Sequence, residues 1–284
     1  MQFAFADLNQ NGREDVVICS FGHNAGRLAW YENTGGQYRE HLLRNLPGAR
    51  RVLIHDLNGD GLPDLVALMA QGQEGIFAYY NQGGGRFKEV PLLRFPPVYG
   101  SSDFELVDFN GDGFLDILST NGDNADYSYS LKPYHGVRLF LNDGQNNFKE
   151  AWFYPLHGAS RTIAHDFDQD GKVDIAAISF FPDFERAPHE SFVYFQNQGD
   201  LQFLPQTFEQ APSGRWLVLE KGDVDGDGDM DLILGSFIYG PAQGGEALLE
   251  KWRQNQIPFV VLENKLKSPN RPYVAGPAAH TPHR

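Results

Sequence analysis

The acidic residues of this sequence concentrate in a nine-residue pattern that occurs five times, at residues 7–15, 56–64, 108–116, 166–174 and 223–231. The pattern is DxNxNGxxD, DxNxDGxxD or DxDxDGxxD, and two clear copies are DFNGDGFLD from Asp108 and DVDGDGDMD from Asp223. In a tight loop, positions 1, 3 and 5 direct their side-chain oxygens inward, and position 9 adds a further carboxylate. Carboxylates packed this closely repel one another in water unless a hard cation lies among them.

Calcium is the cation that these loops predict, with up to five ions in the chain. Magnesium needs a smaller octahedral site, and zinc prefers His or Cys ligands, which do not recur in the pattern. A helical EF-hand is excluded because its loop closes with a glutamate at position 12, and no copy has an acidic residue there. The alternative is a set of Asx and glycine turns without metal.

The predicted ligands occupy positions 1, 3, 5, 7 and 9, and position 7 contributes its backbone carbonyl. We call the five copies loop 1 to loop 5 in chain order. A glycine at position 6 is expected where a Cβ atom would clash in the sharp turn. The predicted ligand residues are Asp7, Asn9, Asn11, Arg13, Asp15, Asp56, Asn58, Asp60, Leu62, Asp64, Asp108, Asn110, Asp112, Phe114, Asp116, Asp166, Asp168, Asp170, Lys172, Asp174, Asp223, Asp225, Asp227, Asp229 and Asp231.

Loop 1 should bind most weakly, because Asn9 and Asn11 stand where other copies carry carboxylates. The chain has 23 basic and 37 acidic residues, a formal net charge of −14, and five calcium ions would bring this to about −4. An acidic chain of this kind repels nucleic acid and anionic lipid surfaces. With no apolar run of membrane-spanning length, we expect no membrane insertion.

Each loop lies between two predicted strands, as in residues 51–55 before loop 2 and the β-branched run after it. A third strand ends in an Asn-x-Gly turn, for example at residues 76–81, and a more polar fourth strand follows. Only residues 246–256 have helical periodicity, and the last unit lacks a clear fourth strand. The fold class is therefore all-β, a propeller of four-stranded antiparallel blades. A β-sandwich is the alternative, although it gives no reason for the regular repeat.

With DFNGDGFLD, DVDGDGDMD and the Asn-x-Gly turns, the sequence resembles the FG-GAP or VCBS repeat family, which includes the integrin α-chain head and bacterial secreted or surface proteins. The resemblance implies a calcium-stabilised propeller for adhesion or ligand binding, usually with seven blades. Five loops are visible, so we expect either a fragment of a larger ring or a smaller ring, and the start at a first strand favours the fragment. We expect the propeller to occupy residues 1–267, and a proline-rich tail or linker to occupy residues 268–284.

Aromatic and polar residues in the long connections at the other end of the strands form the predicted ligand face. Packing of these side chains against their own blade is the alternative. The candidate ligand-binding residues are Tyr127, Tyr129, Lys132, Tyr134, His135, Arg161, Arg215 and Trp216.

Our leading hypothesis is a non-enzymatic binding, adhesion or scaffold module that recognises a glycan or protein, within a longer multidomain protein outside the cytoplasm. We expect any export signal to lie outside this chain. The alternative is a carbohydrate-active enzyme, a lyase or hydrolase, with acid or base roles for His135, His157, Lys132 or Arg161. No known catalytic motif supports that alternative. A third possibility is a module that only spaces other domains.

Overall fold

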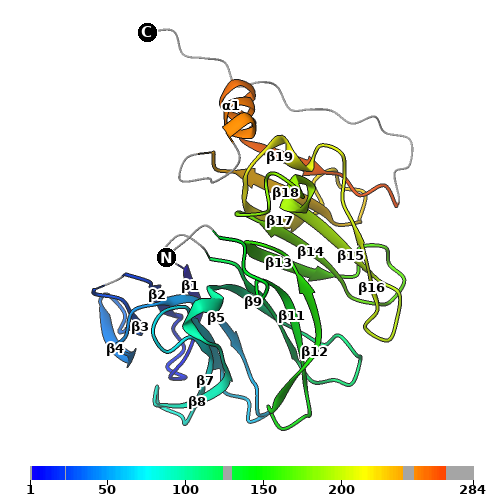
Figure 1. Ribbon diagram of the computed structural model, residues 1–284. Helices are drawn as coiled ribbons and strands as arrows, with labels where there is room; N and C mark the ends of the chain where they lie inside the picture. The colour runs from blue at the N-terminus through cyan, green and yellow to red at the C-terminus, as the bar shows by residue number, and fades with distance from the viewer. Residues whose placement is uncertain (1, 23, 124–129, 239–245, 267–284) are drawn as a thin grey trace. The chain divides into compact units, whose positions relative to one another are not determined.

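The computed structural model describes residues 2–22, 24–123, 130–238 and 246–266. Within these residues the strands form five antiparallel sheets, four with four strands and one with three. The chain divides into two compact units, unit 1 (residues 1–123 and 134–155) and unit 2 (residues 124–133 and 156–284), and Figure 1 labels most of their strands and the helix α1. No helix in the described residues is long and apolar enough to cross a membrane.

Three sheets lie in unit 1 and two in unit 2. Unit 1 contains β1 (Gln2–Ala6), β2 (Asp15–Ser20), β3 (Arg27–Asn33), β4 (Tyr38–Arg44), β5 (Ala49–His55), β6 (Asp64–Met69), β7 (Gly75–Asn81), β8 (Phe87–Arg94), η1 (Pro97–Tyr99), β9 (Ser101–Val107), β10 (Asp116–Asn121), β11 (Gly136–Asn142) and β12 (Phe148–Pro155). Unit 2 contains β13 (Ala159–His165), β14 (Asp174–Ser179), η2 (Pro188–Ser191), β15 (Phe192–Asn197), β16 (Phe203–Gln206), η3 (Ala211–Ser213), β17 (Trp216–Gly222), β18 (Asp231–Ser236), α1 (Glu246–Asn255) and β19 (Phe259–Leu262).

Every sheet is built from the same unit, as the sequence predicts. Each loop joins the first strand to the second, and the second strand begins at the position-9 aspartate, as β6 does at Asp64. The third strand runs antiparallel to the second and ends at the asparagine of the turn. The last sheet has no fourth strand among the described residues, and the predicted helix is α1.

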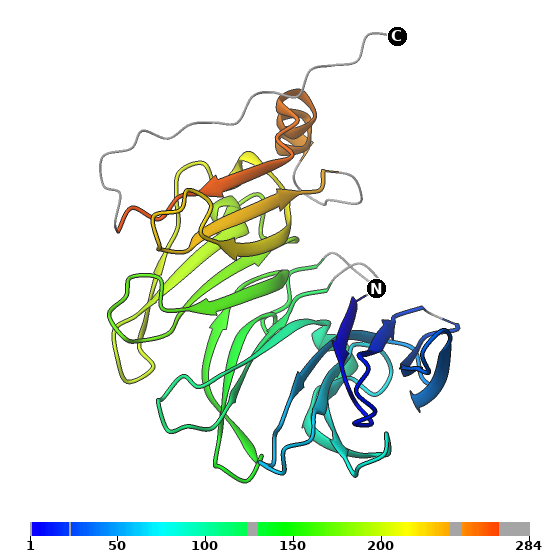
Figure 2. The same cartoon turned by 180° about the vertical axis from the view of Figure 1, so that it is seen from behind.

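The core of unit 1 lies between neighbouring sheets, since side chains alternate between the two faces of each strand. Val17 and Trp30 of the first sheet pack in one buried cluster with Ala67 and Phe77 of the second. The opposite face of the second sheet packs against the third. In Figure 2 the first sheet, in dark blue, lies beside the second. Cys19 is a free thiol within this cluster, and burial raises its pKa to about 12, so it is a poor nucleophile.

Polar contacts join the first strands of neighbouring sheets. In unit 1 the Gln2 side chain accepts a hydrogen bond from Val52 N at 2.8 Å and donates one to Val52 O at 3.2 Å. Arg51 on β5 forms ion pairs with Asp103 and Glu105 on β9. These polar contacts hold adjacent sheets together in addition to the hydrophobic packing between them.

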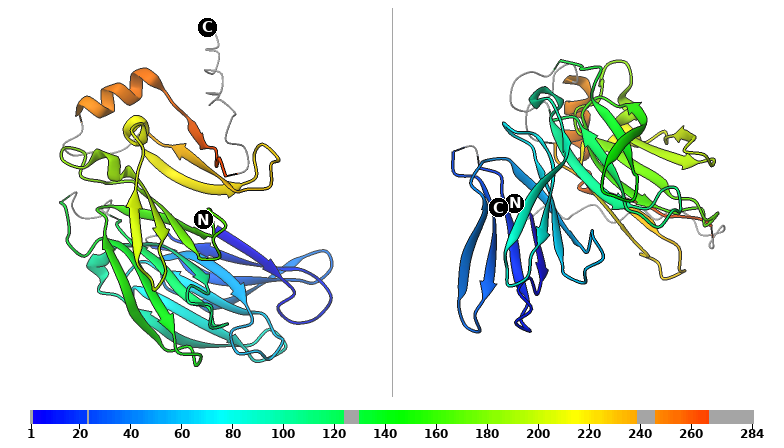
Figure 3. Two further views of the ribbon diagram at one scale, coloured as in Figure 1. Left: turned by 90° about the vertical axis from the view of Figure 1, so that its right-hand side faces the viewer. Right: turned by 90° about the horizontal axis from the view of Figure 1, so that it is seen from below.

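The core of unit 2 has the same construction. Leu219 and Leu234 of the last sheet pack in one cluster with Ile163 and Phe192 of the sheet before it. The helix α1, orange in the left view of Figure 3, buries Trp252, whose indole donates to Pro212 O at 2.8 Å.

Candidate metal centres

The position-1 aspartate organises each loop through backbone hydrogen bonds. Asp56 Oδ2 accepts from Gly61 N at 2.8 Å, and Asp108 Oδ2 accepts from Gly113 N at 2.9 Å. The same bond between positions 1 and 6 is present in the other three loops. In loop 2 the hydrogen bond from Gly61 is the main cause that lowers the pKa of Asp56, which favours the charged form.

Positions 3 and 5 are held in the same way. In every loop the position-3 side-chain oxygen accepts from the backbone N–H of position 5. The position-5 side-chain oxygen accepts from the backbone N–H of position 7. The hydrogen bonds of positions 1, 3 and 5 therefore follow one pattern in all five loops, and the convergence of these side-chain oxygens on a cation stays a prediction.

The carboxylates come close enough to share a cation in two loops. Ligand atoms of Asp166, Asp168 and Asp174 lie within 4.8 Å of one another in loop 4, and those of Asp223, Asp225 and Asp227 do so in loop 5. These donor sets consist of hard oxygen atoms, which fit calcium. In loop 4 the ammonium group of Lys172 also forms an ion pair with Asp170.

The position-9 aspartate has a bracing role that the sequence does not reveal. In loop 2, Asp64 Oδ2 accepts from Leu57 N at 3.0 Å, and Asp64 Oδ1 accepts from Asn81 N at 2.7 Å. The four other loops have the same pair of bonds. Burial raises the pKa of Asp64, Asp116 and Asp174. This aspartate therefore ties the loop to the third strand, and its ligand role stays a prediction.

The turn asparagine after the third strand belongs to the site as well. Asn81 Nδ2 donates to Leu8 O of loop 1 at 2.8 Å, and Asn264 Nδ2 donates to Phe167 O of loop 4 at 2.8 Å. Each asparagine thus reaches the loop of the preceding sheet. Within each unit, loops and turns lie at the same end of the strands, as predicted. Sequence reasoning found the turn at Asn81 but missed Asn264, because Lys265 and Leu266 follow it where a glycine was the signal.

The position-6 glycines are required for a different reason from the predicted clash. Their φ angles lie between +79° at Gly12 and +89° at Gly113. A Cβ atom added at Gly12, Gly61, Gly113 or Gly171 would meet no atom within 4 Å. The left-handed backbone, and not crowding, therefore selects glycine. Position 4 is also left-handed, and loops 1 and 4 place Gln10 and Gln169 there.

The predicted ligand face is only partly accessible. Tyr127 and Tyr129 lie outside the described residues. Lys132 and Tyr134 are half-buried, and the Tyr134 ring stacks on Tyr99 with centroids 5.0 Å apart. Arg161 is half-buried and paired with Glu220 at 2.6 Å.

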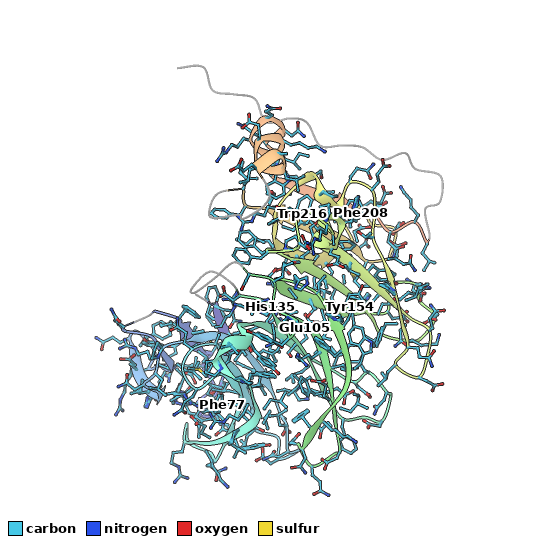
Figure 4. The ribbon with its side chains drawn as sticks, in the orientation of Figure 1. Phe77, Glu105, His135, Tyr154, Phe208 and Trp216 are labelled. Carbon is cyan, nitrogen blue, oxygen red and sulfur yellow. The ribbon has the colours of Figure 1, made fainter. Side chains whose placement is uncertain are left out.

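Three of the predicted ligand contacts are core residues. Trp216 and His135 are 0 % exposed and Arg215 is 1 % exposed, and Figure 4 labels the first two. The Trp216 indole donates to Ala211 O at 2.8 Å, and the Arg215 guanidinium lies 3.8 Å from the Phe180 ring centroid. The prediction that these three side chains contact a ligand directly is wrong, because a ligand on the surface cannot reach them. Packing, the alternative, describes their positions.

A cavity of about 370 Å³ lies in unit 1, and none of the predicted ligand-binding residues lines it. It is lined by residues of β3, β4, β7 and β8 and of the turn between the last two, among them Trp30, His41, Phe87 and Glu89. The Trp30 and His41 rings stack with centroids 4.2 Å apart. Trp30 is only 2 % exposed, so most of its side chain packs in the core and little of it faces the cavity.

Repeated antiparallel sheets with one aspartate-rich loop each define a β-propeller whose blades carry candidate metal sites. The model of the FG-GAP-like repeat matches residues 7–67, 56–119 and 166–234, more than half of the chain. The chain belongs to the FG-GAP-like repeat family. A search of curated protein sequences found no match.

Solved structures with a similar fold include the Bombyx mori GH32 beta-fructofuranosidase BmSUC1 and a mutant of it in complex with sucrose. Each comparison has 14% sequence identity and a TM-score of 0.39, and covers 79% of this chain. The chain spans just over half of those structures, 56% of their length.

Proposed function

We propose that this chain is a calcium-stabilised binding or scaffold module that works outside the cytoplasm. The observation that carries the proposal is the clustering of carboxylate oxygens within 4.8 Å in loops 4 and 5, on a loop geometry that all five copies share. Such clusters are electrostatically unfavourable without a cation. The hard oxygen ligands and the backbone carbonyl available at position 7 favour calcium.

The proposed location follows from the affinity expected of such sites. The loops are short, and most of their carboxylates at positions 1, 3 and 5 are at least partly exposed. Sites of this kind in extracellular modules bind calcium in about the 10⁻⁴–10⁻³ M range, which matches calcium levels outside cells. Calcium would then be a permanent structural component of the blades.

The proposed ligand is a glycan or a protein that binds at the end of the blades away from the loops. The half-buried stack of Tyr99 and Tyr134 supports this, because an aromatic surface next to polar groups suits sugar rings and peptides. The Arg138 guanidinium lies 5.1 Å from the centroid of the Tyr99 ring.

Calcium binding is tested by elemental analysis and by thermal unfolding with and without EGTA. Asp112→Asn and Asp227→Asn should lower the Tm by several degrees in calcium but have little effect in EGTA, because each removes a ligand charge. Asp200→Asn is the matched control, since Asp200 is exposed, lies outside the loops and has a φ of 51° that asparagine tolerates. An unchanged melting curve in EGTA, with no calcium in the purified protein, would refute the proposal.

Ligand binding is tested on a glycan array in calcium, followed by product analysis of any bound glycan. Tyr134→Ala should reduce binding, while Tyr38→Ala, at an exposed tyrosine on β4, should leave it unchanged. New reducing or unsaturated ends would instead establish an enzyme.

A further inference from the structure

Loop 1 carries the fewest carboxylates of the five loops. Counting positions 1, 3, 5 and 9, it has only Asp7 and Asp15, whereas loops 2 and 3 have three each and loops 4 and 5 have four each. Fewer charges mean weaker calcium binding. Yet Asn9 and Asn11 have the same backbone hydrogen bonds as the corresponding residues of the other loops. The shape of loop 1 is therefore retained while its charge is reduced.

A carboxylate from the third strand approaches loop 1 at this point. Glu32 lies on β3 directly before the turn asparagine, and its Oε1 accepts a hydrogen bond from Asn9 Nδ2 at 3.2 Å. In loop 2 the equivalent amide, Asn58 Nδ2, donates instead to Asp60 Oδ2 at 2.9 Å. Loop 1 has an asparagine in place of that aspartate, so the Asn9 amide turns to Glu32.

Loop 4 has the reverse arrangement at the same place in the repeat. Gln196 on β15 also precedes the turn asparagine, and its Nε2 donates to Asp168 Oδ2 at 2.7 Å. In these two loops the third strand thus presents an amide donor to the position-3 aspartate of loop 4 and a carboxylate acceptor to the position-3 asparagine of loop 1. In loop 5 the corresponding residue, Glu263, forms an ion pair with Lys265 at 2.7 Å.

Glu32 is held firmly for this role. Its Oε2 lies 2.9 Å from His41 Nε2, and the His41 ring stacks on the buried Trp30. The Glu32 side chain is 22% exposed, so solvent screens its charge less than that of a surface glutamate. Two anchored oxygens restrict the carboxylate to one orientation next to Asn9.

We propose that Glu32 is a positioning residue of loop 1 that supplies the third negative charge of this site and orients the Asn9 amide, so that loop 1 binds a calcium ion. The inference rests on the proposed calcium binding of the loops. By accepting from the amide nitrogen, Glu32 leaves Asn9 Oδ1 directed to the centre of the loop. An outer carboxylate of this kind raises the basicity of the ligand it contacts.

The test is a calcium titration of Glu32→Gln by isothermal calorimetry at pH 8, where imidazole groups carry little charge. We expect one site to weaken about tenfold, the lower end of the effect of removing an outer-shell partner, while the other sites keep their affinities. The matched control is Glu14→Gln, which removes the same charge from an exposed side chain within loop 1. That control should change the affinity less than about threefold.

A double-mutant cycle assigns the effect to loop 1. Adding Glu32→Gln to an Asp7→Asn background, which disables loop 1, should produce no further loss, whereas in an Asp223→Asn background the loss should remain about tenfold. Equal affinities for Glu32→Gln and the wild type, or a loss that persists in the Asp7→Asn background, would overturn the inference. A wild-type protein that binds no calcium would instead refute the proposed function.

Discussion

At the scale of single residues, Glu74 is a buried acid outside the loops, and its pKa is raised. It lies in the connection between β6 and β7 and is 2% exposed. Its Oε1 accepts from Ser101 N at 2.8 Å and from Ser101 Oγ at 2.6 Å, which ties the second blade to the third within unit 1. Burial raises the pKa of Glu74 to about 7, and the nearby Asp123 adds to the effect.

The raised pKa of Glu74 predicts a pH-dependent stability. The folded protein holds this proton more tightly than the unfolded chain, so the stability that Glu74 contributes is present in full below about pH 4.5 and is lost as the pH rises through about 7. The loss is about 3 kcal/mol for a shift of this size. In calcium-saturated urea titrations, Glu74→Gln should remove this fall between pH 5 and pH 8.

Glu40→Gln, at a more exposed glutamate on β4, is the control for that experiment. It should keep the pH slope of the wild type. A Glu74→Gln protein whose unfolding free energy falls with pH as steeply as the wild type would contradict the assignment.

At the scale of elements, two turn asparagines, Asn81 and Asn264, each join a blade to the blade before it. Asn81 Nδ2 donates to Leu8 O of the preceding loop and to Pro63 O of its own blade. Asn33 occupies the same place in the first blade, but its Nδ2 donates only to Glu14 O of its own blade, at 3.3 Å. Both accept from the glycine two residues later. A comparison of Asn81 with Asn33 therefore measures the effect of the hydrogen bond between blades alone.

Asn81→Ala should therefore destabilise the protein more than Asn33→Ala. The first substitution leaves the buried Leu8 carbonyl without its donor, which costs about 1–3 kcal/mol, whereas the second leaves an exposed turn. Chemical denaturation of the two variants measures the difference. Equal losses would mean that the bond between blades adds nothing to stability.

The sequence predicts the elements well where its signal is a spacing. Alternate aspartates, the Asn-x-Gly turns after the third strand in the first four blades and the helix at Glu246–Asn255 are visible because each leaves a repeated pattern. The roles of Trp216 and Glu32 were not predictable, because a core tryptophan and a loop tryptophan look identical in a sequence. Glu32 lies 23 residues from Asn9, and only the pairing of strands brings them together. The requirement for glycine was predicted correctly, but its reason was wrong.

At the scale of the whole molecule, the proposed calcium binding predicts that charge couples the loops to stability. The formal net charge is −14, and loss of five calcium ions would expose this charge in full. In EGTA we expect a lower Tm that rises again as sodium chloride is added, because salt shortens the screening length from about 8 Å to about 3 Å at 1 M. In calcium the same salt should change the Tm little. A Tm in EGTA that does not change with the salt concentration would mean that lost coordination bonds, and not repulsion between carboxylates, cause the destabilisation.

The bond between a turn asparagine and the loop before it also bears on how such a chain can lengthen. The second repeat carries a donor for the repeat before it, Asn81 Nδ2, and an acceptor carbonyl for the repeat after it, Leu57 O, which accepts from Asn146 Nδ2 at 3.1 Å. A duplicated gene segment that encodes one repeat would therefore arrive with both halves of its junctions already in place. Tandem growth needs no newly evolved contact, and this compatibility is a physical reason for one motif to be copied along a chain.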